Sequence, residues 1–311
     1  MRGLIIKTTS NAYSVLRENG EVMLAHIKGN IRLRGIRSTN PVAVGDHVVL
    51  QDDWITDIEP RTNYIIRKAT NLSRESQILA ANIDQVALVI TLTHPETNLT
   101  FVDRFLATAE AYRIPALLVF NKVDLLEGEA YNPQLKELQA LYESLGYQTL
   151  AISAKGGKGI EEVKSLLKDK TTLLSGNSGV GKSTLINAIL GEERAKTAEI
   201  SESHLQGTHT TTFSEMFFIY DPGTPGSDKT RIIDIPGIRG FGTFDFEKTE
   251  VSHYFREIFR IGSECRYSDC LHTEGVPGCA VLPAVVDGRI AISRYQSYLS
   301  MLGDIDETKY R

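Results

Sequence analysis

Residues 176–183 constrain the fold of this chain more than any other part of its sequence. They read Gly-Asn-Ser-Gly-Val-Gly-Lys-Ser, follow the apolar run Thr171–Leu174 and lead into the helix-like stretch Lys182–Leu190. A glycine-rich turn between a strand and a helix points backbone N–H groups at phosphate oxygens. The pattern therefore predicts a mostly parallel α/β sheet with a phosphate-binding loop where a strand ends.

Each part of this loop has an expected role. Gly176 and Gly181 permit the tight backbone path. Lys182 is expected to bridge the β- and γ-phosphates, and Ser183 to donate its hydroxyl oxygen to Mg²⁺. The alternative is a glycine-rich turn beside a solvent-exposed lysine. The expected nucleotide-contacting residues of the loop are Gly176, Asn177, Ser178, Gly179, Val180, Gly181, Lys182, Ser183 and Thr184.

A second segment, Asn121-Lys122-Val123-Asp124, follows the apolar run Ala116–Phe120. The carboxylate of Asp124 can accept hydrogen bonds from N1–H and the N2 amino group of guanine, a pair of donors that adenine lacks. Asn121 can contact the base and brace the phosphate loop, while the stem of Lys122 can pack over the purine. These residue types favour GTP over ATP as the ligand.

Ser153-Ala154-Lys155 follows another strand-like run and matches the companion loop whose backbone N–H contacts guanine O6. Alone, this short string is more typical of a surface turn. After the Asn121–Asp124 segment in the same sheet, it predicts further nucleotide contacts by Ser153, Ala154 and Lys155.

The segment Asp234-Ile235-Pro236-Gly237 lies downstream of both motifs. We expect Asp234 to hold Mg²⁺ through water and the N–H of Gly237 to sense the γ-phosphate. Ordinary G proteins carry the phosphate loop first and the guanine-reading segment after it. The reversed order here predicts a circularly permuted GTPase domain.

The polar stretch Ser201–Thr212 is too irregular for a helix, and one threonine of Thr210–Thr212 is expected to reach Mg²⁺ and the γ-phosphate. The sequence does not select among the three, and Thr211 is our choice. Ile238 occupies the place where Ras-like GTPases carry a water-orienting glutamine. His209 is the nearest substitute, and a solvent-exposed loop histidine is the alternative.

Hydrophobic patterning divides the chain into three predicted domains. Residues 1–70 carry about five short Ile- and Val-rich strands between turn residues, which fits an OB-fold. Residues 71–245 alternate strands and helices, as a doubly wound GTPase sheet requires. Residues 246–311 are expected to be mainly helical and to bind zinc, with helices at 251–261 and 290–302. The expected strands are 3–8, 12–17, 22–27, 31–34, 47–51, 54–58, 85–91, 116–120, 148–152, 171–174 and 230–233, and the other helices 101–112, 133–145, 159–168 and 182–190.

The net charge of −5 argues against a surface that binds nucleic acid everywhere, so any such contact is expected to be local. Residues 1–70 contain ten Lys and Arg against seven Asp and Glu. Along 30–34, Ile31 and Leu33 can face inward while Arg32 and Arg34 face outward. Together with Lys28 and Arg37 they form a candidate RNA-binding strip, and the alternative is a solvated barrel face.

All three cysteines of the chain lie within residues 265–279, with His272 between them. Three thiolates and one imidazole are the ligands of a closed, tetrahedral Zn²⁺ site, for which a structural role is expected. The alternative is a set of metal-free reduced thiols. The predicted ligands are Cys265, Cys270, His272 and Cys279.

No apolar run approaches the length of a membrane span, no signal-peptide pattern opens the sequence, and the cysteines do not form a disulfide framework. These observations favour a cytoplasmic protein without a membrane partner.

Over essentially its whole length, the chain resembles the RsgA family of bacterial GTPases that depend on the small ribosomal subunit. The resemblance rests on Gly176–Thr184, Gly207–Thr212, Asp234–Gly237 and the cysteine-histidine cluster. It implies that His209 is catalytic and that GTP is hydrolysed to GDP and phosphate with stimulation by the small subunit during late maturation. It also implies rRNA contact by Arg32 and Arg34. We expect a monomer.

Two other functions fit the same residues. The chain can be a GTP-dependent switch for another RNA or protein partner, with the outer domains as docking modules. It can also be an RNA-binding protein in which nucleotide is structural. GTP turnover with and without small subunits separates the three.

Overall fold

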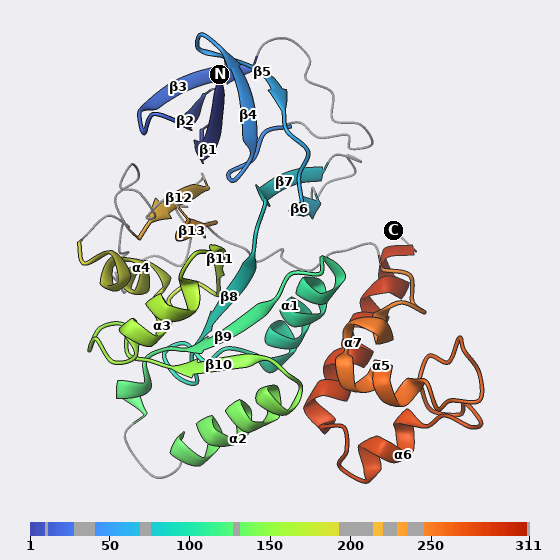
Figure 1. Cartoon of the computed structure of the whole chain (residues 1–311). Coiled ribbons are helices and arrows are strands. Elements are labelled where there is room, and N and C mark those ends of the chain that lie inside the picture. The colour runs from blue at the N-terminus through green and yellow to red at the C-terminus, as the bar shows by residue number, and fades with distance from the viewer. Residues whose placement is uncertain are drawn as a thin grey trace.

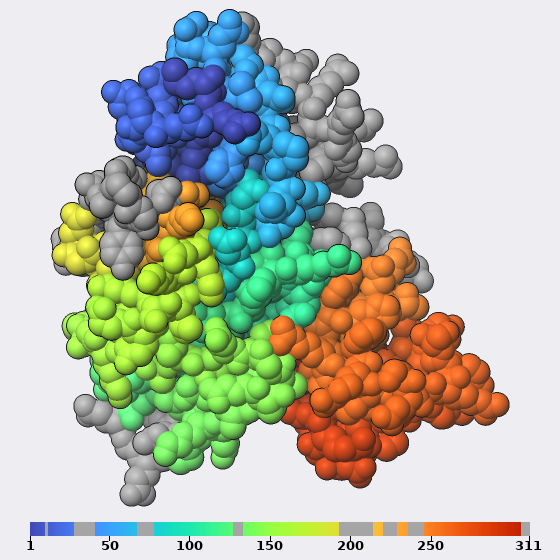
Figure 2. Space-filling model, viewed as in Figure 1, coloured from blue at the N-terminus to red at the C-terminus, as the bar shows by residue number. Residues whose placement is uncertain are grey.

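The structure is a computed structural model of the 311-residue chain. It describes residues 1–9, 12–27, 41–68, 76–126, 131–192, 214–219, 229–235 and 246–309. The expected strand at 31–34 lies outside these residues. The described part divides into a barrel, a central sheet covered by helices, and a helical region, with the barrel and the helical region on different sides of the centre (Figures 1 and 2).

The N-terminal strands form the predicted five-stranded, OB-like barrel. They run in the order β1-β2-β3-β5-β4, and β4 pairs back onto β1 to close it. Alternating side chains fill the interior, among them the fully buried Ile5, Val15 and Ile55. The strands are β1 Arg2–Thr8, β2 Tyr13–Arg17, β3 Val22–Ile27, β4 His47–Gln51 and β5 Trp54–Ile58.

The central sheet has the order β10-β9-β8-β11-β13-β12, and its first five strands are parallel. The strand β12 runs antiparallel to β13, pairs on its other side with β1 of the barrel, and was not predicted. The strands are β8 Gln85–Ile90, β9 Ala116–Phe120, β10 Gln148–Ala151, β11 Thr171–Ser175, β12 Glu215–Phe218 and β13 Arg231–Asp234.

Helices cover both faces of this sheet, as the continuous apolar runs of its strands require. Along β8, Leu88 packs into the core on the side of α1 Leu99–Ala111 and α2 Tyr131–Ser144. The next residue, Val89, packs on the opposite side against α3 Ile160–Leu167 and α4 Lys182–Leu190. The predicted doubly wound sheet is thereby confirmed. A short 3-10 helix, η1 Val123–Leu125, follows β9.

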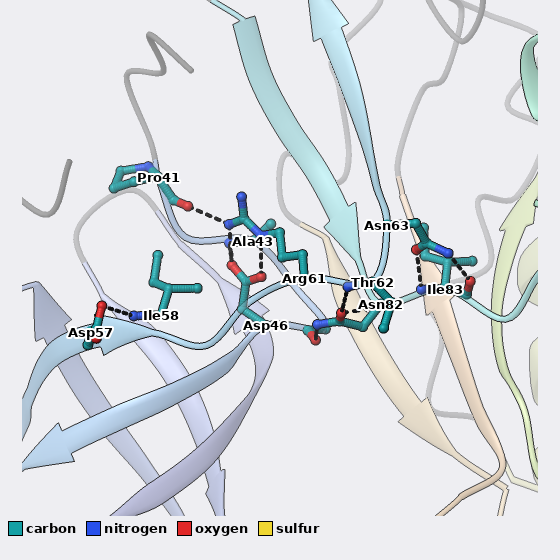
Figure 3. Close-up of polar contacts among 11 residues, drawn as sticks. Pro41, Ala43, Asp46, Asp57, Ile58, Arg61, Thr62, Asn63, Asn82 and Ile83 are labelled. Atoms are coloured by element: carbon teal, nitrogen blue, oxygen red, sulfur yellow. Dashed lines mark hydrogen bonds and ion pairs between the residues drawn. The ribbon is translucent and has the colours of Figure 1, made fainter. Parts of the chain in front are cut away.

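A two-stranded sheet, β6 Tyr64–Lys68 with β7 Ser76–Ala81, connects the barrel to β8. It was not predicted, and the domain boundary expected at residues 70–71 falls between its strands. The Asn63 side chain donates to Ile83 O and accepts from Ile83 N, both at 2.7 Å (Figure 3). Asn82 donates to Gly45 O at 2.8 Å and accepts from Thr62 N at 2.9 Å.

Gly45 and Asp46 complete this junction on the barrel side. Gly45 has φ +93°, and a Cβ there would lie 2.1 Å from Ala81 O, so only glycine permits the close approach. Asp46 is fully buried and forms a bidentate ion pair with Arg61 at 2.6 Å, while Arg61 also donates to Pro41 O (Figure 3). The barrel is therefore joined to the sheet by side chains that bond backbone groups and by one buried ion pair.

The C-terminal region is helical as predicted, but the single helix expected at 251–261 is wrong. The chain forms the 3-10 helix η2 Val251–Tyr254 and then α5 Arg256–Gly262, separated by an extended Phe255. The Phe255 ring is fully buried edge-on against Tyr298, which explains the break. The helices α6 Val281–Val286 and α7 Ile292–Lys309 follow, and the expected 290–302 helix corresponds to α7.

None of the helices in the described part of the chain has the length and apolar character needed to cross a membrane.

Candidate nucleotide site and metal cluster

The phosphate loop lies between β11 and α4, at the carboxyl end of the central strand. Lys182 is the first residue of α4, and its Nζ donates to the carbonyls of Gly176 and Asn177 at 2.7 and 2.9 Å. Through these two hydrogen bonds, the Lys182 side chain folds back onto the phosphate loop. Burial lowers the pKa of Lys182, and the nearby Asp234 opposes that effect.

Asn121 connects the phosphate loop to the Ser153–Lys155 loop. Its Nδ2 donates to Val180 O at 2.8 Å, and its Oδ1 accepts from Ala154 N at 2.9 Å. A Cβ on Gly181 would lie 2.5 Å from Asn121 Nδ2, and Gly181 has φ +92°, so this contact requires glycine. Three segments far apart in the sequence are held together by one buried amide.

Lys122 follows Asn121 in a left-handed backbone conformation, with φ 62°. Its Nζ donates to the carbonyl of His94, in the loop between β8 and α1. Burial lowers the pKa of Lys122, and Asp124 opposes the shift. The lysine therefore lies between the base-reading segment and the 91–98 loop.

The remaining residues predicted to read guanine are also in the described part of the chain. Asp124 is exposed. Ser153 is buried, accepts from Gly156 N at 2.9 Å, and exchanges backbone hydrogen bonds with Lys158, which shape the loop. Ala154 is buried, whereas Lys155 is exposed.

Asp234 ends β13 beside the phosphate loop. Its Oδ1 is buried and has no hydrogen-bond partner in the described structure. Burial raises the pKa of Asp234, Lys182 lowers it, and Glu215 on the neighbouring strand raises it further. A buried carboxylate oxygen without a partner suits a hydrated divalent cation, so the donor set fits Mg²⁺.

The predicted metal ligands converge in the helical region. The ligand atoms of Cys265, Cys270, His272 and Cys279 all lie within 4.8 Å of one another. His272 Nδ1 is 3.5 Å from the sulfur of Cys265 and 3.7 Å from that of Cys279. Burial lowers the pKa of His272, which favours the neutral, ligating imidazole.

The backbone around this cluster is fixed from α7. Tyr295 Oη donates to His272 O and Tyr298 Oη to Leu271 O, each at 2.7 Å. Burial raises the pKa of the Cys270 thiol to about 11, and the neighbouring Cys279 adds to that rise. A cation is the group that would stabilise three thiolates here, so the donors fit a structural metal.

Several predicted residues lie outside the described part of the chain. They are the catalytic His209, the switch residues Thr211 and Gly237, and the RNA-binding Lys28, Arg32, Arg34 and Arg37. Their roles stay predictions.

Three residues near the nucleotide site were not predicted from the sequence. His94 supplies the carbonyl that Lys122 contacts, and Pro95 lies 3.3 Å from the position that a Cβ on Gly179 would take. Glu215 lies directly opposite Asp234 in the β12–β13 pair. No local pattern marks these residues, because their contacts depend on strand order.

Comparisons with known proteins agree with this arrangement. The family model described as RsgA GTPase matches residues 58–244. A protein of Bacteroides fragilis strain YCH46, named small ribosomal subunit biogenesis GTPase RsgA, is 53% identical over 100% of this chain and 99% of its own length. A protein of the same name from Porphyromonas gingivalis strain ATCC 33277 is 51% identical with the same coverage.

Two solved structures are also similar. The crystal structure of YjeQ from Thermotoga maritima has a TM-score of 0.74 and 34% identity, covering 98% of both chains. The structure of YloQ, titled a circularly permuted GTPase, has a TM-score of 0.69 and 27% identity, covering 100% of this chain and 96% of that one. The family match and the full-length relatives show that this chain belongs to the RsgA GTPase family.

Proposed function

We propose that this protein is a GTPase of small ribosomal subunit biogenesis, and that the subunit stimulates its conversion of GTP to GDP and phosphate. The observation that carries the proposal is full-length identity of 53% to a relative named for that process, in a chain whose Asn121 joins the guanine and phosphate loops. The proposed location is the cytoplasm, and the proposed active form is a monomer.

Guanine recognition is proposed to rest on Asp124 and the Asn121 bridge. The exposed carboxylate of Asp124 can accept from the N1–H and N2 amino groups of the base. Ala154 N already donates to Asn121 Oδ1, so the Ser153–Lys155 loop is held where it can face guanine O6. Lys122, fixed to the 91–98 loop, is placed to cover the purine.

Phosphate binding is proposed to redirect Lys182. Its ammonium now contacts two loop carbonyls, Gly176 O and Asn177 O, and the β- and γ-phosphates are stronger acceptors for the same donor. Ser183, Thr211 and Asp234 are the proposed residues for Mg²⁺. When bound, Mg²⁺ neutralises charge on the β- and γ-phosphate oxygens.

Hydrolysis is proposed to use His209 to orient the attacking water. Ile238, directly after Gly237, has no polar group for that task. A neutral imidazole can hold water by a hydrogen bond and accept a proton as charge develops. Gly237 is proposed to sense the γ-phosphate through its backbone N–H.

The two outer regions are proposed to dock on the subunit. Zn²⁺ held by Cys265, Cys270, His272 and Cys279 is the proposed stabiliser of the helical region. In the barrel region, Lys28, Arg32, Arg34 and Arg37 are the proposed rRNA contacts.

The proposal is tested by measuring GTP turnover of the full chain with and without purified small ribosomal subunits. We expect slow turnover alone and strong acceleration by small subunits. Large subunits at the same concentration are the control. Equal turnover under all conditions would contradict the ribosomal role and favour a switch for another partner. No turnover under any condition would contradict the enzymatic role.

Two variants test the site within the same assay. His209→Ala should reduce turnover while leaving GDP affinity unchanged, and wild-type turnover in this variant would remove the catalytic assignment. Asp124→Asn should shift preference from guanine towards xanthine nucleotides by roughly a hundredfold, because the amide N–H can donate to the C2 carbonyl of xanthine, whereas the carboxylate accepts from the N2 amino group of guanine. Unchanged GTP affinity would contradict the base assignment.

A further inference from the structure

Four charged side chains connect the barrel to the phosphate loop. Lys7 on β1 forms an ion pair with Glu215 on β12, with Nζ and Oε1 3.0 Å apart. Glu215 and Asp234 are paired residues of the antiparallel strands β12 and β13. Asp234 in turn interacts electrostatically with Lys182. The order is Lys7, Glu215, Asp234 and Lys182, so positive charges flank two adjacent carboxylates.

Asp234 is the member of this series most sensitive to its neighbours. Its Oδ1 is buried without a hydrogen-bond partner in the described structure, so nearby charges act on it with little screening by water. Glu215 lies one strand away and is half-buried. A change in the net charge around Glu215 therefore changes the electrostatic potential at the position proposed for Mg²⁺.

The contact between the barrel and β12 is narrow. A single residue pair, Lys7 with Glu215, defines the β1–β12 register, and Thr8 N donates to Ser214 O at 3.3 Å. The side chains of Lys7 and Glu215 are 39% and 37% exposed, so the ion pair is partly open to solvent. A small displacement of the barrel would separate this pair without unfolding either partner.

We propose that Glu215 is a positioning residue that raises the affinity of the nucleotide site for Mg²⁺, and that Lys7 moderates this effect from the barrel. With Lys7 in place, much of the negative charge of Glu215 is compensated. Without Lys7, the uncompensated carboxylate strengthens the attraction for a cation at Asp234. The barrel thereby adjusts how firmly the Mg²⁺–nucleotide complex is held.

This inference rests on the proposed function and adds a regulatory route to it. RNA binding that draws β1 away from β12 would strengthen Mg²⁺ binding, and by reciprocity Mg²⁺ binding would weaken the Lys7–Glu215 pair. The barrel contact and the metal site are then linked through a carboxylate that touches no nucleotide.

The experiment follows release of a fluorescent GDP analogue from the full chain while Mg²⁺ is varied, without ribosomes or turnover. The measured quantity is the Mg²⁺ concentration that gives half-maximal slowing of release. Glu215→Gln should raise this concentration about fivefold, and Lys7→Met should lower it about twofold. Both shifts should become smaller in high salt, because Lys7 and Glu215 are partly open to solvent, but should not vanish, because Asp234 is buried.

Arg2→Met is the matched control. Arg2 lies on the same strand as Lys7 and pairs with Glu59 at 2.9 Å, at the other end of β1 from the Glu215 contact. This variant removes the same charge from the barrel and should leave the Mg²⁺ dependence unchanged. Lys7→Arg, which keeps the charge, should behave like the wild type and shows whether charge or side-chain shape is responsible.

The double variant Lys7→Met with Glu215→Gln separates coupling from a general charge effect. It should match Glu215→Gln alone, because Lys7 is expected to act only through Glu215. The inference is overturned if Lys7→Met behaves like Arg2→Met, or if it produces the same shift in the Glu215→Gln background. A wild-type chain that binds no guanine nucleotide would instead overturn the proposed function.

Discussion

The two outer regions are attached to the central sheet by different chemistry. The barrel junction uses the neutral amides of Asn63 and Asn82, which bond backbone groups 20 to 37 residues away in the sequence, together with the buried ion pair of Asp46 with Arg61. The helical region instead inserts Arg294 of α7 against Asp103 of α1, 191 residues away. In the barrel junction one buried carboxylate is matched by one guanidinium, whereas in the helical junction two buried carboxylates share the single guanidinium of Arg294.

The charged junction is fully enclosed. Arg294 pairs with Asp103 at 2.8 Å and with Glu257 at 2.7 Å, and all three side chains are at most 2% exposed. Tyr142 and Ser297 also donate to Asp103, at 2.9 and 2.6 Å. Burial alone lowers the pKa of Arg294, but Asp103 and Glu257 more than offset this and raise it.

This difference predicts how much stability each junction loses when one interaction is removed. If one amide hydrogen bond is lost, the barrel is still attached to the central sheet through the strands and turns that connect the two. Losing the Arg294 guanidinium leaves two carboxylates, Asp103 and Glu257, buried without compensation, which is more costly. Single substitutions should therefore destabilise the helical region more than the barrel junction. Loss of metal from its cysteine-histidine cluster would be a second way to destabilise it.

Metal removal should have the largest effect. If the Cys265–Cys279 cluster holds a structural metal, a strong chelator should unfold the helical region, because free energies of structural zinc binding reach about 10–16 kcal/mol in isolated zinc fingers. Hydrogen exchange should increase in α5 and α6 and change little in the barrel. Metal analysis of the purified protein is the control, and equal exchange with and without chelator would contradict a structural role.

Arg294→Met should have the second largest effect on stability. It removes a buried cation while roughly keeping the packing volume, and we expect a loss of about 3–5 kcal/mol in the stability of the helical region. Urea denaturation monitored by hydrogen exchange of α7 measures this loss of stability. Arg289→Met is the matched control, because Arg289 forms a 3.8 Å exposed pair with Asp287 and should change stability by less than about 0.5 kcal/mol. Equal effects of the two variants would show that the buried Arg294 group does not stabilise the helical region more than an exposed pair.

Asn82→Gly should have the smallest effect of the three. Glycine accepts the left-handed backbone at this position, φ 54°, but loses the contacts to Gly45 and Thr62. We expect a cost of about 1–2 kcal/mol, measured as the urea midpoint of the barrel.

Asp52→Gly is the control for Asn82→Gly, because Asp52 also has a left-handed backbone, φ 55°, and its side chain is exposed. It should change stability by a few tenths of a kcal/mol. A loss for Asn82→Gly that equals the loss for Arg294→Met would show that both junctions depend on buried polar groups to the same degree.

Regular elements were predicted well where hydrophobic pattern and turn residues agreed. The strands Val22–Ile27 and Ala116–Phe120 and the helix Lys182–Leu190 have the bounds expected from the sequence. The strands β6, β7 and β12 were missed. β12 is only four residues long, and its partners β13 and β1 are distant in the sequence, so no local signal specifies it.

The break at Phe255 shows the same limitation in a helix. The residues from Val251 to Ile261 have a helical pattern, yet Phe255 is extended. Its ring fills a site between Tyr298 and the Arg294 guanidinium, whose carbon lies 4.7 Å from the ring centroid. Packing against α7 therefore outweighs local helical preference.

By itself, the sequence determined the chemistry and the order of this protein's parts. The phosphate loop, the guanine-reading segment, the cysteine-histidine cluster and the permuted order are all local patterns, because loops and ligand sets require particular residues at particular spacings. The tertiary structure alone decided which distant groups meet. Asn121 reaches Val180, Arg294 reaches Asp103, and Lys7 reaches Glu215 because strand order and helix packing bring them together, and no sequence spacing encodes such contacts.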